Sequence, residues 1–189
     1  MSAYPAALRP RLAEVRLLVL DVDGVLTDGR LYYNGEGEAM KGFHAHDGLG
    51  IRLLSYIGVE VAVITARESP PVVRRLRDLA VTEARFGVEN KGHAIAELIA
   101  ARGLARPQVA FVGDDLLDLP ALARAGVSIT VANGHSLLRS RVDWVTASPG
   151  GQGAVREIAD GLLDARDMLE ESCRALLRDL GESAPGLMS

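Results

Sequence analysis

Short apolar runs alternate with segments of helical period along this chain, and that alternation limits the possible folds more than any other feature. Strands are expected over 17–20, 59–64, 109–112, 127–131 and 142–145. Helices are expected over 47–57, 69–79, 91–102, 119–125 and, as one long helix, from 153 to about 180. Nearly uninterrupted aliphatic strands separated by helices are typical of a parallel sheet that is covered on both faces. The sequence therefore predicts an α/β, doubly wound, Rossmann-like fold.

The length of 189 residues, 48% of them hydrophobic, suits one well-buried core. We expect a single domain over 1–189, with a core at about 15–163 and a helical C-terminal tail at 164–189. A Gly-rich turn within 28–43, flanked by residues suited to strands, predicts a β-hairpin flap after the first strand. The spacing between the other polar motifs leaves no room for an inserted cap domain.

Charge and apolar content exclude several classes of function. The formal net charge is −4, and Lys and Arg are scattered, so the sequence predicts no nucleic-acid partner. Apolar stretches fall short of the ~20 residues that a membrane span needs, so no membrane partner is expected. The N-terminus lacks the pattern of a secretory signal, and the single Cys173 has no internal disulfide partner. We therefore expect a cytoplasmic protein.

Acidic residues follow two of the predicted strands. Asp21 and Asp23 come directly after the first apolar run, and Asp114, Asp115 and Asp118 follow the run at 109–112. Asp and Gly are common in ordinary turns after strands, so either cluster alone is weak evidence. Because carboxyl ends of parallel strands meet at one edge, two such clusters predict a shared acidic site. Carboxylates held so close are costly unless a cation neutralises them or one of them carries a proton, and Mg²⁺ suits oxygen ligands.

This arrangement favours phosphoryl transfer. Asp21 is the expected nucleophile, which would form an aspartyl-phosphate, and Asp23 is the expected general acid and base. The expected metal ligands are the Asp21 carboxylate, the Asp23 backbone carbonyl and the Asp114 carboxylate, with Asp115 or Asp118 orienting bound water. Thr65, at the end of another strand, would hydrogen-bond a phosphoryl oxygen through its hydroxyl and amide. Lys91 would stabilise the charge that develops on the phosphoryl group.

Several cationic and polar residues are candidates for binding an anionic substrate. Arginine forks suit carboxylate and phosphate, and we place Arg67, two residues after Thr65, first among them. Arg52 and Arg75 on the adjacent predicted helices are further candidates. His44 and His46 lie beside Asp47 and Gly48 at the exit from the hairpin, where one of the two imidazoles would reach the substrate.

With these residues identified, the chain resembles the haloacid dehalogenase superfamily of phosphatases over about 17–163. The motifs that carry the resemblance are Asp21 to Thr27, Thr65, Lys91, and Gly113 to Asp115 with Asp118. Within that superfamily it resembles the capless, tetrameric phosphatases that act on 3-deoxy-D-manno-octulosonate 8-phosphate in lipopolysaccharide biosynthesis. Supporting residues are Lys41 with Phe43, the run from Asp47 to Ile51, and the run from Gly150 to Glu157.

The resemblance implies a phosphorylated sugar acid as substrate and a homotetramer in which each hairpin caps a neighbouring site. It implies Mg²⁺ on Asp21, Asp23 and Asp114. Substrate contacts would fall on His44, His46, Asp47, Gly48, Arg52, Arg67, Arg75 and Lys91. The chain has Ala66 where the family usually has Gly, and His44 and His46 where Asn and Arg are common. A phosphatase for nine-carbon ulosonate 9-phosphates and a catalytically silent regulatory module therefore stay open as alternatives.

Overall fold

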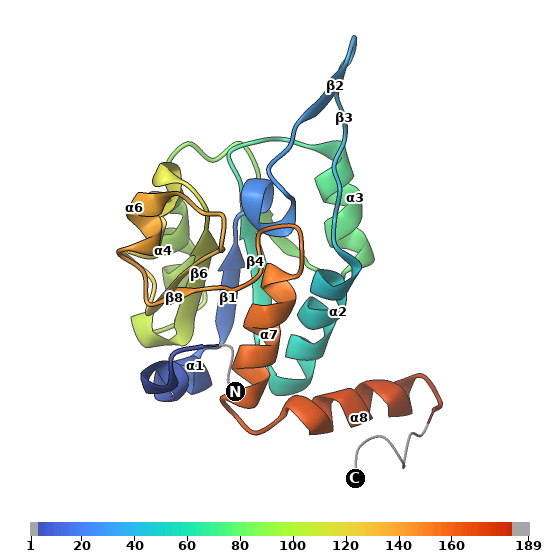
Figure 1. Ribbon diagram of the computed structural model, residues 1–189, viewed down its shortest axis with the longest axis vertical. Helices are drawn as coiled ribbons and strands as arrows, with labels where there is room; N and C mark the ends of the chain where they lie inside the picture. Colours follow the sequence, from blue (N-terminus) through green and yellow to red (C-terminus); the bar gives the residue numbers. More distant parts are fainter. Residues whose placement is uncertain (1–3, 183–189) are drawn as a thin grey trace.

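A parallel sheet forms the centre of the molecule in the computed structural model, which describes residues 4–182 (Figure 1). Its strand order is β5-β4-β1-β6-β7-β8 among the described residues. The strands are β1 (Leu17–Leu20), β4 (Glu60–Ile64), β5 (Glu83–Arg85), β6 (Val109–Gly113), β7 (Val127–Thr130) and β8 (Trp144–Val145). β1 pairs in parallel with β4 and β6, which places Leu20 opposite Val63 and Val112. The first strand therefore lies at the middle of the sheet.

Side chains of β1 alternate between two hydrophobic cores, one on each face of the sheet. Leu18 and Leu20 belong to the larger core, and Leu17 and Val19 belong to the smaller one. All four side chains are fully buried. Burial of such a side chain contributes about 1.5–3 kcal/mol, so a strand that is apolar on both faces is stable only at the centre of a covered sheet.

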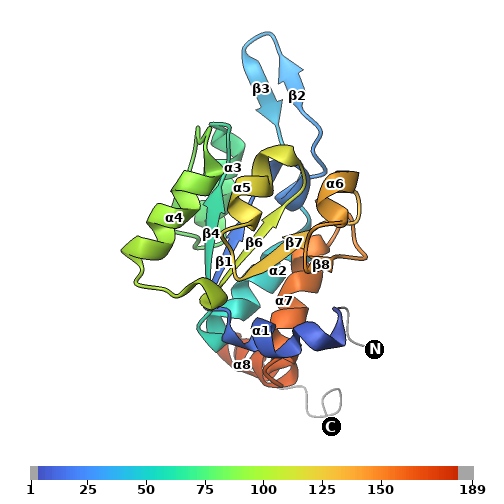
Figure 2. The same ribbon diagram turned by 90° about the vertical axis from the view of Figure 1, so that its left-hand side faces the viewer.

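Helices cover both faces of the sheet (Figures 1 and 2). The larger core includes buried residues of α1 (Arg9–Glu14), α2 (Ala45–Leu54), α3 (Pro70–Asp78), α7 (Ala154–Asp164) and α8 (Leu169–Asp179). The smaller core includes buried residues of α4 (Lys91–Ala101), α5 (Leu119–Leu122) and α6 (Ser136–Arg139). Short 3₁₀ turns occupy Ala6–Leu8, Ser55–Ile57, Arg106–Gln108 and Leu116–Asp118. The predicted doubly wound α/β fold is confirmed.

The predicted hairpin is also confirmed, as β2 (Tyr32–Asn34) paired antiparallel with β3 (Gly37–Met40). It projects from the end of the molecule at which β1 and β4 terminate (Figure 1). Asn34 Oδ1 accepts a hydrogen bond from the Glu36 amide at 2.9 Å, and Gly37 has a φ of 126°, so the tip is a tight turn that needs glycine. Tyr33 is 60% exposed and Met40 is 56% exposed, which leaves apolar surface on the hairpin.

Several elements differ from the sequence prediction, and the short helices α1 and α6 were not predicted at all. β5 was not predicted, because this short edge strand is only half-buried and includes the charged Glu83 and Arg85. The single helix predicted from 153 to about 180 is two helices, α7 and α8. The chain turns between them, with Asp167 at a φ of 58° and the Met168 amide bonded to the Leu163 carbonyl at 2.9 Å. No Gly or Pro marks this break in the sequence, and helical periodicity continues across it.

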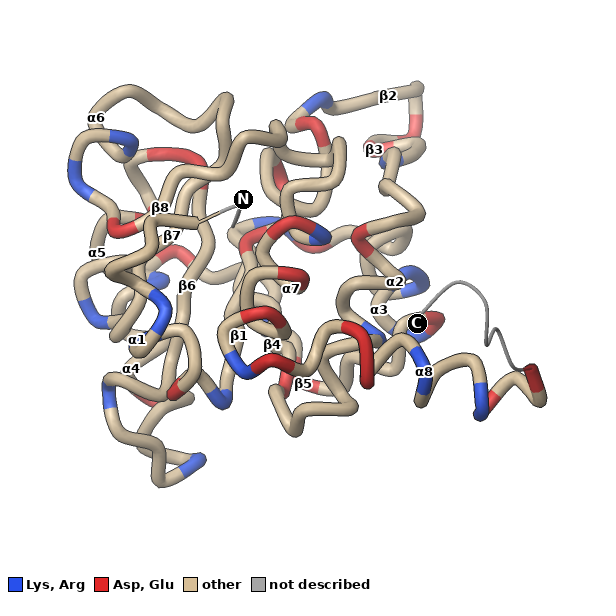
Figure 3. The backbone as a smooth tube through the Cα atoms, turned by 60° about the horizontal axis from the view of Figure 1, so that its bottom comes forward, with Lys and Arg blue, Asp and Glu red and all other residues tan. Residues whose placement is uncertain are grey.

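Charged residues of both signs are interspersed over the helices and loops (Figure 3). Within the described part of the chain, none of the helices combines the length and the apolar character that crossing a bilayer requires.

Candidate active site

The carboxyl ends of β1, β4 and β6 bring three predicted residues to one cleft. Asp21, Thr65 and Asp114 follow those strands and line a cavity of about 300 Å³. Asp23, Arg67 and Lys91 also line it. The site lies where open α/β sheets bind ligands, and the convergence that the sequence predicted is present.

Glycines shape the turn that presents Asp21 and Asp23. Gly24 has a φ of 91°, and a Cβ there would strike the Asp114 carboxylate. A Cβ on Gly150 would strike the Gly24 carbonyl, and the Gly151 amide donates to the Val25 carbonyl at 2.9 Å. The turn after β1 is therefore held from the opposite side by the loop before α7, which explains why both segments need glycine.

Lys91 links two buried carboxylates. Its Nζ lies 2.8 Å from Asp21 Oδ1 and 2.7 Å from Asp118 Oδ1. Asp118 Oδ2 accepts the amides of Asp114 at 2.9 Å and Asp115 at 3.2 Å. Burial alone would lower the pKa of Lys91, but the two carboxylates outweigh it and raise the pKa. Lys91 is therefore a charged ammonium in contact with the predicted nucleophile.

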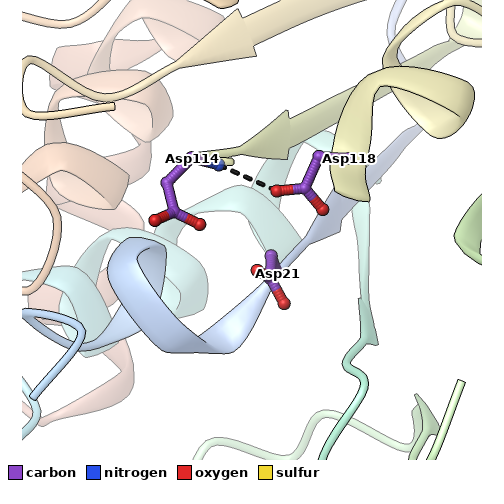
Figure 4. Close-up of side chains that lie close together, drawn as sticks. All are labelled: Asp21, Asp114 and Asp118. Carbon is purple, nitrogen blue, oxygen red and sulfur yellow. Dashed lines mark hydrogen bonds between the residues drawn. The ribbon is translucent and has the colours of Figure 1, made fainter. Parts of the chain in front are cut away.

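Asp21, Asp114 and Asp118 point toward a common space (Figure 4). One oxygen from each lies within 4.8 Å of the others. Burial, followed by the Asp118 charge, raises the pKa of Asp21 to about 6. Burial, followed by the Asp21 and Asp118 charges, raises the pKa of Asp114 to about 7. Three carboxylates this close fit a hard divalent cation, and Asp118 is the one whose two oxygens already accept from Lys91 and from two amides.

Asp23 faces the same cleft from the other side of the turn. Its Oδ2 lies 3.6 Å from Arg67 Nε, and its Oδ1 bonds to Lys41 Nζ. Thr65 is 2% exposed, and its amide donates to the Arg85 carbonyl at 3.0 Å. Only the hydroxyl of Thr65 is therefore available to a ligand, and the predicted use of its amide is wrong.

The segment at the hairpin exit has a structural role that the sequence did not predict. Asp47 is 2% exposed, and its Oδ1 accepts the Arg156 amide at 2.8 Å in the first turn of α7. Burial raises the pKa of Asp47, while hydrogen bonds from backbone amides, the first of them that of Arg156, oppose the rise. A Cβ on Gly48 would strike the Arg75 guanidinium. Asp47 thus caps α7, while its contact with substrate stays a prediction, and Gly48 allows α2 to approach α3.

The remaining predicted substrate residues do not line this cleft. Arg52 borders another cavity, which is also lined by residues at the starts of β4 and β5. That cavity lies at the amino ends of the strands, whereas Asp21 lies at their carboxyl ends. Its predicted contact with this subunit's site is therefore wrong. Arg75 lies over the Phe43 ring at 5.8 Å, and the rings of His44 and His46 meet edge to face at 4.9 Å. For these three side chains, substrate contact stays a prediction.

Lys41, Glu38 and Ser69 are connected to the site, although no chemical role was predicted for them. Lys41 Nζ also lies 3.1 Å from Glu38 Oε2, and Ser69 Oγ donates to Glu38 Oε1. One signal in the sequence was available, since Lys41 and Lys91 are the two lysines of a chain with nineteen arginines.

A doubly wound sheet with paired aspartates after its first strand, and with Thr65, Lys91 and Asp114 at neighbouring strand and helix ends, is the architecture of a haloacid dehalogenase-like hydrolase. The family model of that description matches residues 87–158. The 3-deoxy-D-manno-octulosonate 8-phosphate phosphatase of Escherichia coli (strain B / BL21-DE3) is 43% identical over 167 residues, which cover 88% of this chain and 89% of that protein. The chain belongs to this phosphatase family.

Solved structures agree with this assignment. The cobalt-bound deoxy-D-mannose-octulosonate 8-phosphate phosphatase of Haemophilus influenzae is 41% identical with a TM-score of 0.83, covering 85% of this chain and 94% of that one. The Moraxella catarrhalis 3-deoxy-D-manno-octulosonate 8-phosphate phosphatase, in complex with magnesium, phosphate and KDO, is 35% identical with a TM-score of 0.86. That match covers 90% of this chain and 98% of the Moraxella catarrhalis chain.

Proposed function

We propose that this protein is a Mg²⁺-dependent phosphatase that hydrolyses 3-deoxy-D-manno-octulosonate 8-phosphate to the free sugar acid and phosphate. The observation that carries the proposal is the Asp21 carboxylate, bound by Lys91 at 2.8 Å and placed beside Asp114 at the cleft. The names of the relatives supply the sugar acid, because their coverage spans nearly the whole chain.

In the first half of the reaction, an Asp21 oxygen attacks phosphorus while the bond from phosphorus to the sugar oxygen breaks. Asp23 gives its proton to that leaving oxygen. In the second half, Asp23 takes a proton from water, the water oxygen attacks phosphorus, and phosphate departs from Asp21. Lys91 and the Thr65 hydroxyl stabilise the negative charge on the transferring group.

A bound Mg²⁺ would neutralise the nucleophile and the phosphoryl oxygens. Asp21 and Asp114 would hold it through their carboxylates and Asp23 through its backbone carbonyl. Asp118 bonds to Lys91 and to two amides, so it would act by fixing the lysine and the loop of Asp114 and Asp115. The raised pKa values of Asp21 and Asp114 support this assignment, because a cation would remove the repulsion that contributes to them.

The assembly and location of the enzyme are part of this proposal. The exposed apolar residues of the hairpin, such as Tyr33 and Met40, support a homotetramer in which hairpins cap neighbouring sites and bring His44, His46 or Arg75 to a partner's substrate. We also propose one domain over 1–189 and a cytoplasmic location, which suit an enzyme of lipopolysaccharide precursor biosynthesis. Sedimentation equilibrium tests the tetramer, and a monomer with full activity would contradict the capping role.

Phosphate release tests the reaction directly. With Mg²⁺, wild type should prefer 3-deoxy-D-manno-octulosonate 8-phosphate to a nine-carbon ulosonate 9-phosphate and to hexose phosphates, and EDTA should abolish turnover. Asp21→Asn should lose activity by at least about 10⁴-fold, since it removes the nucleophile. Equal rates on all esters would reduce the assignment to a general sugar phosphatase. Absence of wild-type activity would favour a silent regulatory module.

A further inference from the structure

Two buried lysines divide the carboxylates around the cleft between them. Lys91 bonds to Asp21 and Asp118, on the side of the nucleophile. Lys41, at the end of the hairpin, bonds to Asp23 and Glu38, and its side chain is 0% exposed. These are the two lysines of the chain, whereas nineteen arginines supply the other cationic side chains. Lysine therefore occurs where a single ammonium joins two carboxylates beneath the protein surface.

The chemistry of the side chain explains why lysine occupies this position. A lysine ammonium is a compact charge on an unbranched stem, whereas a guanidinium is a wide planar fork. Burying an ammonium is costly unless acceptors surround it, and Asp23 and Glu38 provide them. Glu38 also accepts a hydrogen bond from Ser69, the residue before α3. Burial alone would raise the pKa of Glu38, but the donors Ser69 and Lys41 outweigh it and lower the pKa. Lys41 is therefore fixed from two directions.

This anchoring determines how Asp23 is oriented. Lys41 binds Asp23 Oδ1, and Asp23 Oδ2 lies 3.6 Å from Nε of Arg67, which lines the cleft. The Asp23 side chain is 21% exposed, so one oxygen is held inside and the carboxyl group stays accessible from the cleft. Without Lys41, Asp23 Oδ1 would lose its bonded partner, and the more distant Arg67 would be left to hold the carboxyl group.

We propose that Lys41 is a positioning residue, which holds the Asp23 carboxyl group for proton transfer to the leaving alcohol. The base of the hairpin thereby contributes to proton transfer within its own subunit, in addition to any capping of a neighbour. The inference rests on the proposed phosphatase function, since it concerns the step in which Asp23 protonates the sugar oxygen.

The test compares two esters that differ in their need for that proton. A sugar alkoxide leaves only when protonated, whereas 4-nitrophenolate is a weak base that leaves without help. The ratio kcat/KM covers the steps up to release of the alcohol and leaves out the later attack of water, in which Asp23 serves both esters alike. Lys41→Met should lower kcat/KM for 3-deoxy-D-manno-octulosonate 8-phosphate by about 100-fold or more, the size of a general-acid contribution. It should lower kcat/KM for 4-nitrophenyl phosphate by less than about tenfold, and KM for the sugar ester should change by less than about threefold.

Lys91→Met is the matched control, because it removes the other buried lysine by the same substitution. Lys91 acts on the nucleophile and the phosphoryl group, so its loss should slow both esters alike. An equal fall in kcat/KM for both esters in Lys41→Met, or an unchanged kcat/KM for the sugar ester, would overturn the proposal for Lys41. A wild-type enzyme that hydrolyses neither ester would instead refute the proposed function.

A double substitution keeps the test available if Lys41→Met fails to fold. Asp23→Asn combined with Lys41→Met removes both partners, so no unpaired carboxylate is left at Asp23. If Lys41 acts through Asp23, this double variant should hydrolyse the sugar ester at the same rate as Asp23→Asn alone. A further loss of more than about tenfold in the double variant would show that Lys41 acts by another route.

Discussion

Asp114 imposes a cost on folding that a cation should relieve. Burial and the charges of Asp21 and Asp118 raise the pKa of Asp114 to about 7, from an ordinary value of 3.8. The folded state therefore binds the Asp114 proton more tightly than the unfolded state does. Its destabilising effect is full above about pH 7 and shrinks as the pH falls toward 4. A shift of one pKa unit corresponds to about 1.4 kcal/mol, so this shift destabilises the folded state by at most about 4 kcal/mol. Partial solvent exposure of Asp114 reduces the expected destabilisation to about 2 kcal/mol.

Asp114→Asn removes this charge and keeps the shape of the side chain. In EDTA at pH 7.5, the variant should be about 2 kcal/mol more stable than wild type. At pH 5 the difference should shrink, because wild-type Asp114 is then mostly protonated. Mg²⁺ should stabilise wild type and leave the variant nearly unchanged. Urea unfolding followed by the fluorescence of the single, buried Trp144 measures the free energy of unfolding.

The neighbouring Asp115→Asn is the control, since Asp115 is exposed and hydrogen-bonds locally to the Leu116 amide at 2.7 Å. It should change the stability of the metal-free protein by less than about 0.5 kcal/mol. The reasoning is refuted if Asp114→Asn is no more stable than wild type at pH 7.5, or if Mg²⁺ stabilises both to the same extent.

Three further substitutions test the packing around the site. Asp118→Ala should cost about 3–5 kcal/mol in urea unfolding, because it leaves Lys91 short of a partner and two amides unbonded; a loss below 1 kcal/mol would contradict this role. Gly150→Ala should lower kcat and stability together because its Cβ meets the Gly24 carbonyl, whereas Gly42→Ala, in open space, should be neutral in the same assays. Asp47→Ala should lower the free energy of unfolding by about 1–2 kcal/mol, because it removes a cap of α7, and KM should not change. A raised KM would instead support the predicted substrate contact of Asp47.

The sequence predicted the strands that carry the site because their patterns are strong and local. The runs that become β1 and β6 are apolar on both faces, and each is followed at once by aspartate. The same reasoning brought Asp21, Thr65 and Asp114 together, since parallel strands end at one edge. These predictions needed only the chain order and the periodicity.

What the sequence missed depends on contacts between distant segments. Asp47 was assigned to substrate from the family resemblance, yet its carboxylate caps a helix that begins more than a hundred residues later. Arg52 belongs to α2, as Asp47 does, but it lies about two turns beyond the start of that helix and therefore away from the cleft. The break before α8 rests on the left-handed Asp167, a conformation that the sequence did not mark.

The balance of charge in the cleft points to the same metal ligands as the geometry does. Six carboxylates surround the cleft and the hairpin base, namely those of Asp21, Asp23, Glu38, Asp114, Asp115 and Asp118. Lys41, Lys91 and the half-exposed Arg67 are their cationic partners, which leaves an excess of three negative charges when all are ionised. A divalent cation offsets most of that excess. Lys41 is shared by Asp23 and Glu38, and Lys91 is shared by Asp21 and Asp118. Among the described residues no ion pair reaches Asp114, which lies beside Asp21, and these are the two side chains assigned to the metal.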